Sequence, residues 1–127
     1  MNMYHGIIID QSFKDLKYPK NFKVFAKKRD GNWGIYGIEI KENHINETVS
    51  MVQKAMKVGT WYAHFYNDTD LVVVFRNRVF RIGTNISTWS KVFEYGKRIG
   101  IKVEQLDFWP NRFQDEIHYF SSEDFVK

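Results

Sequence analysis

Residues 59–75 read GTWYAHFYNDTDLVVVF, in which two apolar runs are separated by turn-forming residues. The runs at 61–66 and 71–75 are rich in aromatic and β-branched side chains, which favour strands. The Asn-Asp-Thr-Asp sequence at 67–70 is the right length to join them as an antiparallel hairpin. This hairpin decides the fold class, because it requires an antiparallel sheet.

One face of the predicted hairpin is aromatic, because alternate side chains of a strand point to the same side. A four-residue loop sets three residues of the first run opposite three of the second. On this face lie Tyr62, His64 and Tyr66, opposite Phe75, Val73 and Leu71. The other face, with Ala63 and Phe65, is apolar as well, so both sides of the sheet need a cover.

Four further segments have the composition of strands, and they lie at residues 6–9, 22–27, 35–40 and 78–82. Asp30-Gly31-Asn32 forms the turn of a second hairpin. A three-residue loop there keeps apolar residues opposite one another, whereas a two-residue loop does not. The preferred register places Phe22, Val24 and Ala26 opposite Ile40, Ile38 and Tyr36.

Two segments have helical periodicity. In residues 43–58, apolar side chains recur at steps of three and four, and Gly59 follows as a helix stop. A second helix begins at Ser87 and stops at Gly100, and Gly96 within it allows close packing. The whole pattern predicts a single α+β domain over residues 1–127, with an antiparallel sheet of five or six strands and two helices on one face, in a ferredoxin-like arrangement.

Composition limits the possible functions. The chain of 127 residues has 43% hydrophobic residues, and its 11 Phe, 7 Tyr and 4 Trp are too many rings for a disordered chain. Because there is no cysteine, disulfides and thiolate chemistry are excluded. No signal peptide or membrane-spanning run is present, so we expect a cytoplasmic protein that has no membrane partner.

The last segment, residues 101–127, combines aromatic residues with a net negative charge. It carries 3 basic and 6 acidic side chains, whereas the whole chain has a net charge of +4. So many rings cannot remain in water. We therefore expect this segment to pack on the body of the domain or on a second subunit, where it could cover the second sheet face.

The candidate ligand or interface residues lie on that face and in the C-terminal segment, and they are Tyr62, His64, Tyr66, Phe75 and Trp109. A histidine between two tyrosines can bind a polar ligand atom or move a proton, or it can be a structural histidine in a strand. Asp107, Asp115 and Glu116 are interpreted as solvating charges or helix caps. The four histidines lack metal-ligand spacing, so neither a metal nor a cofactor is predicted.

Basic residues near aromatic strands suggest a nucleic-acid surface as an alternative. The candidates are Arg76, Arg78, Arg81, Lys27 and Lys28. Sheets that bind RNA use aromatic side chains to stack bases and basic side chains to hold phosphates. The pattern here is incomplete, because Val58 rather than a basic residue precedes the Gly-aromatic run at residue 59.

Three segments together resemble a family of small uncharacterised prokaryotic proteins with no assigned activity. They are residues 59–66, the hairpin at 71–82, and the stretch from Gly100-Ile101 to Gln105-Leu106-Asp107-Phe108. The resemblance covers about half of the chain and implies a compact α+β fold, without catalytic residues.

The leading hypothesis is a binding or interaction module that uses its second apolar sheet face to form a homodimer or to bind a partner or a small ligand. The alternatives are binding of RNA or single-stranded DNA, and an enzyme of unknown class with a pocket lined by His and Tyr.

Overall fold

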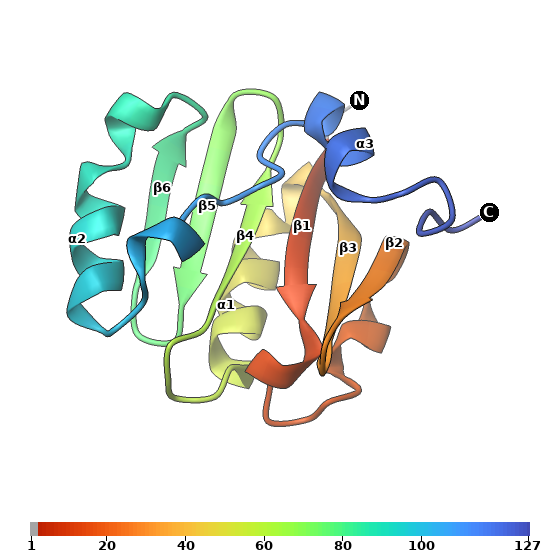
Figure 1. Cartoon of the computed structure of the whole chain (residues 1–127), viewed down its shortest axis with the longest axis horizontal. Coiled ribbons are helices and arrows are strands. Elements are labelled where there is room, and N and C mark those ends of the chain that lie inside the picture. Colours follow the sequence, from red (N-terminus) through yellow and green to blue (C-terminus); the bar gives the residue numbers. More distant parts are fainter. Residues whose placement is uncertain (1–2) are drawn as a thin grey trace.

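The computed structural model describes residues 3–127 and shows an open, six-stranded antiparallel sheet with the strand order β2-β3-β1-β4-β5-β6 (Figure 1). The strands are β1 (Met3–Ile9), β2 (Lys23–Asp30), β3 (Trp33–Lys41), β4 (Tyr62–Tyr66), β5 (Asp70–Phe75) and β6 (Val79–Gly83). The predicted α+β class and the antiparallel sheet are therefore confirmed.

The two longer helices lie on opposite faces of the sheet. Val49 and Val52 of α1 (Ile45–Ala55) pack in one core with Phe65, whereas Val92 of α2 (Ser90–Arg98) packs in the other core with Val73. The prediction of two helices on one face is wrong, and so is the ferredoxin-like arrangement, which needs both on the same side. The physical reason is that β4 and β5 are apolar on both faces, so each face takes a helix.

The C-terminal segment completes the cover of the α2 face within the same chain. It runs from α2 across the sheet to the edge strand β2, and it includes the short helix α3 (Glu116–Tyr119) (Figure 1). Leu106, Phe108 and Phe120 are fully buried in the core of this face. The end of the chain pairs with β2, where the Lys27 N–H donates to the Asp124 carbonyl at 3.0 Å.

The register of the two hairpins shows what the sequence pattern can predict. In β4 and β5, Tyr62, His64 and Tyr66 lie opposite Phe75, Val73 and Leu71, which confirms that prediction. In β2 and β3, Val24 faces Ile38 as predicted, but a bulge at Phe25 shifts the pairs beyond it, so that Ala26 faces Gly37 and Lys27 faces Tyr36.

The helices are shorter than predicted. α1 ends at Ala55, because Met56 is extended and forms an isolated bridge with Phe13. α2 begins at Ser90, after a single 3₁₀ turn that Asn85 caps by accepting from the Ser87 N–H. Gly96 allows the expected close approach, because an added Cβ would lie 2.8 Å from the Leu106 side chain. Among residues 3–127, no helix has the length and apolar character needed to cross a membrane.

Candidate ligand-binding pocket

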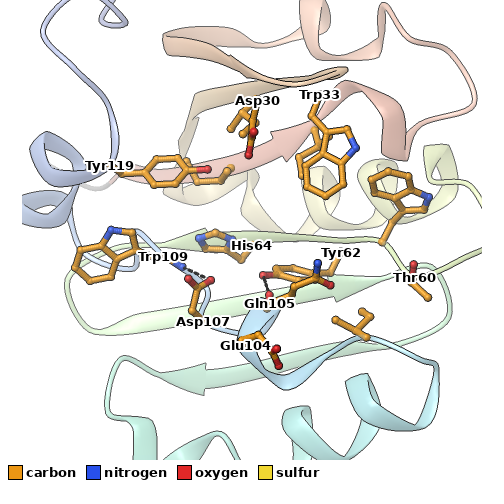
Figure 2. A pocket seen from close by; sticks show the side chains of 15 residues that line it. Asp30, Trp33, Thr60, Tyr62, His64, Glu104, Gln105, Asp107, Trp109 and Tyr119 are labelled. Atoms are coloured by element: carbon orange, nitrogen blue, oxygen red, sulfur yellow. Dashed lines mark hydrogen bonds between the residues drawn. The ribbon is translucent and has the colours of Figure 1, made fainter.

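A pocket of about 300 Å³ lies between the α2 face of the sheet and the C-terminal segment (Figure 2). Its floor is apolar and comes from neighbouring strands: Ile7 faces His64 across β1 and β4, and Ile9 faces Ile35 across β1 and β3. Ile101 adds an apolar wall from the segment after α2. The floor forms here because β1 lies between β3 and β4, although these three strands are far apart in the sequence.

Aromatic side chains form most of the walls. Trp33 and Trp61 lie at one end of the pocket, with ring centroids 5.5 Å apart and planes at 59°. At the other end lie Trp109 and Tyr119, and the Tyr119 hydroxyl points toward the centre of the pocket (Figure 2). Tyr62 completes the set from β4. These rings belong to four separate segments, so the pocket exists only in the folded chain.

His64 is buried at the pocket and is held in its neutral form. Its Nε2 lies 2.7 Å from the carbonyl oxygen of Pro110, and a neutral ring that carries its proton there donates to this oxygen. Burial lowers the pKa of His64 to about 4, although the bond to Pro110 acts in the opposite direction. Since this is its only hydrogen bond to any described residue, the second ring nitrogen is left as an acceptor.

Both tyrosines of the pocket have a raised pKa, so their hydroxyl groups stay protonated at neutral pH. The Tyr62 hydroxyl donates to the carbonyl oxygen of Gln105 at 2.6 Å, and burial raises its pKa well above the usual range. Burial also raises the pKa of Tyr119 to about 12, with further contributions from the negative charges of Asp107 and Asp30. Two carboxylates from opposite sides of the pocket therefore act on the same phenol.

Three carboxylates stand at the exposed rim of the pocket. Asp30 comes from the end of β2, and Glu104 and Asp107 come from the loop after α2. Figure 2 shows Asp30 on one side of the pocket, facing Glu104 and Asp107 on the other. In the described part of the chain, none of the three forms an ion pair, and no lysine or arginine lines the pocket. The pocket is thus apolar at its floor, aromatic at its walls and acidic at its rim.

A buried polar network next to the pocket holds α3 on the sheet. Glu116 Oε2 accepts from the Tyr66 hydroxyl at 2.6 Å and lies 2.5 Å from His5 Nδ1. Burial and the charge of Glu116 raise the pKa of Tyr66 far above its usual range. Tyr66 also stacks on His64, with centroids 5.8 Å apart and planes at 29°. The network therefore packs against His64 and fixes the helix that ends at Tyr119.

The structure brings together some of the candidate residues that the sequence singled out. Tyr62, His64 and Trp109 line the pocket. Tyr66 and Phe75 are buried in the core next to it and do not line it.

The basic candidates are not brought together. Lys27 and Lys28 lie on β2 at one edge of the sheet, whereas Arg81 lies on β6 at the opposite edge, where it donates to Asn46. Arg78 follows β5 and places its guanidinium 4.8 Å from the Phe80 ring centroid. These residues therefore form no single basic surface with Lys27 and Lys28.

Sequence reasoning missed several residues of the pocket. The missed residues lie where no periodic pattern marks them: Asp30 and Trp33 are at strand ends, Trp61 precedes β4, and Glu104 is in a single 3₁₀ turn. The one available signal was the excess of tryptophan beside turn residues. Asp107 was interpreted as a solvating charge, although the structure places it at the pocket rim.

Comparisons with protein families, curated proteins and solved structures find no match to this chain. The resemblance to a family of small prokaryotic proteins therefore stays a prediction. Within residues 3–127, no group of three or more metal-ligating side chains comes together.

Proposed function

We propose that this domain binds a small molecule in the pocket between its sheet and its C-terminal segment. The observation that carries the proposal is the construction of the pocket itself, in which an apolar floor lies beneath aromatic walls and a few polar groups converge at its rim. Ligand sites in proteins have this combination, and a volume of about 300 Å³ is at the small end of their range.

The position of the C-terminal segment favours a ligand over the other occupants expected for the second sheet face. Leu106, Phe108 and Phe120 already bury most of this face within one chain. A dimer across the sheet would have to displace them, and the rings of Tyr66 and Phe75 on this sheet face are buried, so bases cannot stack on them. The homodimer, the nucleic-acid partner and the cytoplasmic location stay predictions from the sequence.

His64 favours a binding role over proton transfer. Its Nε2 is engaged by Pro110, and a pKa of about 4 leaves the ring neutral at pH 7. A neutral ring that is fixed in this way is suited to accept a hydrogen bond from a ligand.

A ligand screen by NMR tests the proposal. Amide spectra of the ¹⁵N-labelled chain are recorded with a library of neutral, cationic and anionic aromatic compounds. We expect hits to shift the amides of Ile7, His64 and Trp61. Ile9→Trp, which fills the pocket, should abolish the shifts, whereas Ile86→Trp at an exposed site should not. The proposal is wrong if no compound shifts the pocket amides of the unsubstituted chain.

A further inference from the structure

The charged side chains that line the pocket are all acidic. Asp30, Glu104 and Asp107 come from separate segments, and they converge on a single pocket in a chain whose net charge is +4. None of them is neutralised by an ion pair in the described residues. Carboxylates gathered in this way repel an anion and attract a cation, and the low-dielectric walls strengthen the field between them.

The aromatic walls add a second preference for a cation. Faces of Trp and Tyr rings attract ammonium groups, and several rings around one site form a cage for them. Five rings line this pocket: Trp33, Trp61, Tyr62, Trp109 and Tyr119.

One of these rings already holds an ammonium group. Lys28 Nζ lies 3.6 Å from the centroid of the Tyr119 ring and donates to the Tyr119 carbonyl oxygen at 2.7 Å. The Lys28 contact is independent of the carboxylates, because it is made with a ring and a backbone oxygen. It shows that the Tyr119 ring takes an ammonium group on the face that Lys28 covers.

From these observations we infer that the ligand is a small organic cation. Its ammonium group lies among the rim carboxylates and the rings, and its apolar body rests on the isoleucine floor. This inference rests on the proposed function, since it names the chemical class of the molecule that the same pocket binds. The neutral His64 ring at the floor is compatible with such a ligand, because its unbonded nitrogen is an acceptor and carries no positive charge.

A series of three compounds with the same phenethyl body and a cationic, neutral or anionic end group tests the inference. Phenethylamine is a cation at pH 7, 2-phenylethanol is neutral, and 3-phenylpropionate is an anion. Binding of each is measured at low salt by titration of the ¹⁵N-labelled full chain. We expect the cation to bind about tenfold more tightly than the alcohol, since both cation–π and Coulomb attraction favour it, and the anion to bind most weakly.

Two double variants locate the origin of the preference. Asp30→Asn combined with Asp107→Asn should weaken binding of the cation about fivefold and leave binding of the alcohol unchanged, because only the charge at the rim is lost. The matched control combines Glu42→Gln, in the 3₁₀ turn just before α1, with Glu47→Gln in the first turn of α1. Both lie away from the pocket, and the pair removes the same total charge. This control should change neither affinity.

The possible failures can be told apart. If the three compounds bind equally, or if the anion binds best, the cation inference is overturned, while the proposed pocket function stands. An equal loss of cation affinity in the control variant also overturns it, because the attraction would then come from the overall charge. If none of the three binds, the cation inference fails, and the ligand screen decides whether the proposed function fails with it.

Discussion

The Tyr66 hydroxyl donates a hydrogen bond of 2.6 Å to Glu116 Oε2, although the two residues are 50 positions apart in the sequence. Both groups are buried, and the same carboxylate oxygen lies 2.5 Å from His5 Nδ1. Because Glu116 begins α3 and Tyr119 ends it, this contact fixes the position of one pocket wall. The stability of the sheet and the shape of the pocket therefore depend on the same buried carboxylate.

Replacing Tyr66 with Phe removes this hydrogen bond and keeps the ring. We expect Tyr66→Phe to lower the free energy of unfolding by about 1.5–3 kcal/mol, since a buried hydrogen bond to a charged group is lost. Urea denaturation measures the change. Tyr95→Phe is the matched control: within the described residues the Tyr95 hydroxyl makes no hydrogen bond, so its loss should cost no more than about 0.5 kcal/mol. Equal effects of the two variants would contradict the prediction.

The low pKa of His64 predicts a loss of stability in acid. The folded-state pKa is about 4 and the pKa of an unperturbed histidine is 6.5, so the unfolded chain binds a proton more readily between these two values. The contribution of the neutral His64 ring to the free energy of unfolding is complete above pH 6.5 and is lost as the pH falls toward 4. At pH 5 this loss amounts to about 2 kcal/mol.

His64→Gln isolates the effect, because an amide can still donate to the Pro110 carbonyl but does not titrate in this range. Unfolding free energies of both chains are measured at pH 7.5 and pH 5. We expect the unsubstituted chain to lose about 2 kcal/mol more than the variant over this interval. If both lose the same amount, His64 is not the group responsible.

The elements of the sheet could be predicted from the sequence, because strand periodicity is a local property. The pairing of His64 with Val73 followed from a loop of four residues and was confirmed. The bulge at Phe25 was not predictable in this way. It places the Phe25 ring against His5, with centroids 4.1 Å apart, and that contact depends on a strand far away in the sequence.

For a similar reason, the sequence does not predict on which face of the sheet each helix lies, or which residues make up the whole pocket. Strands that are apolar on both faces do not indicate which face a helix covers, so α1 and α2 were assigned to the same side. The pocket depends on Ile9, Trp33 and Trp61, which approach one another only because β1 lies between β3 and β4. Sequence reasoning identified the residues of β4 that line the pocket, since these followed from a single hairpin.

Gly6 of β1 leaves room for the Phe65 ring of β4. It lies opposite Phe65, and a Cβ at residue 6 would be only 2.5 Å from Cδ1 of the Phe65 ring. Because Phe65 is fully buried and its ring is rigid, we expect Gly6→Ala to destabilise the fold by about 1–3 kcal/mol in urea denaturation. Combining Gly6→Ala with Phe65→Leu should recover part of this loss relative to Phe65→Leu alone. No such coupling in the double-variant cycle would show that the ring is not the obstacle.

The end of the chain protects the edge strand β2. The Lys27 N–H donates to the Asp124 carbonyl at 3.0 Å, the Val126 N–H donates to the Phe25 carbonyl at 2.9 Å, and the Phe125 ring packs against Phe120. Removing residues 122–127 leaves these two groups of β2 unpaired, and an unpaired strand edge is a template for pairing with another chain. The truncated chain should therefore exchange the Lys27 amide faster and lose about 1–2 kcal/mol of stability, because half-buried apolar area is exposed.

Self-association is the second expected result of the truncation. Light scattering of the truncated chain should show a molecular mass that rises with protein concentration, because the exposed edge of β2 pairs between molecules. Val126→Ala is the control: it retains both backbone hydrogen bonds and should leave the Lys27 amide protected and the mass constant. If the truncated chain keeps slow exchange at Lys27, the C-terminal pairing does not protect this edge in solution. If exchange becomes fast but the mass stays constant, the charged side chains Lys23 and Lys27 of β2 are enough to prevent pairing between molecules.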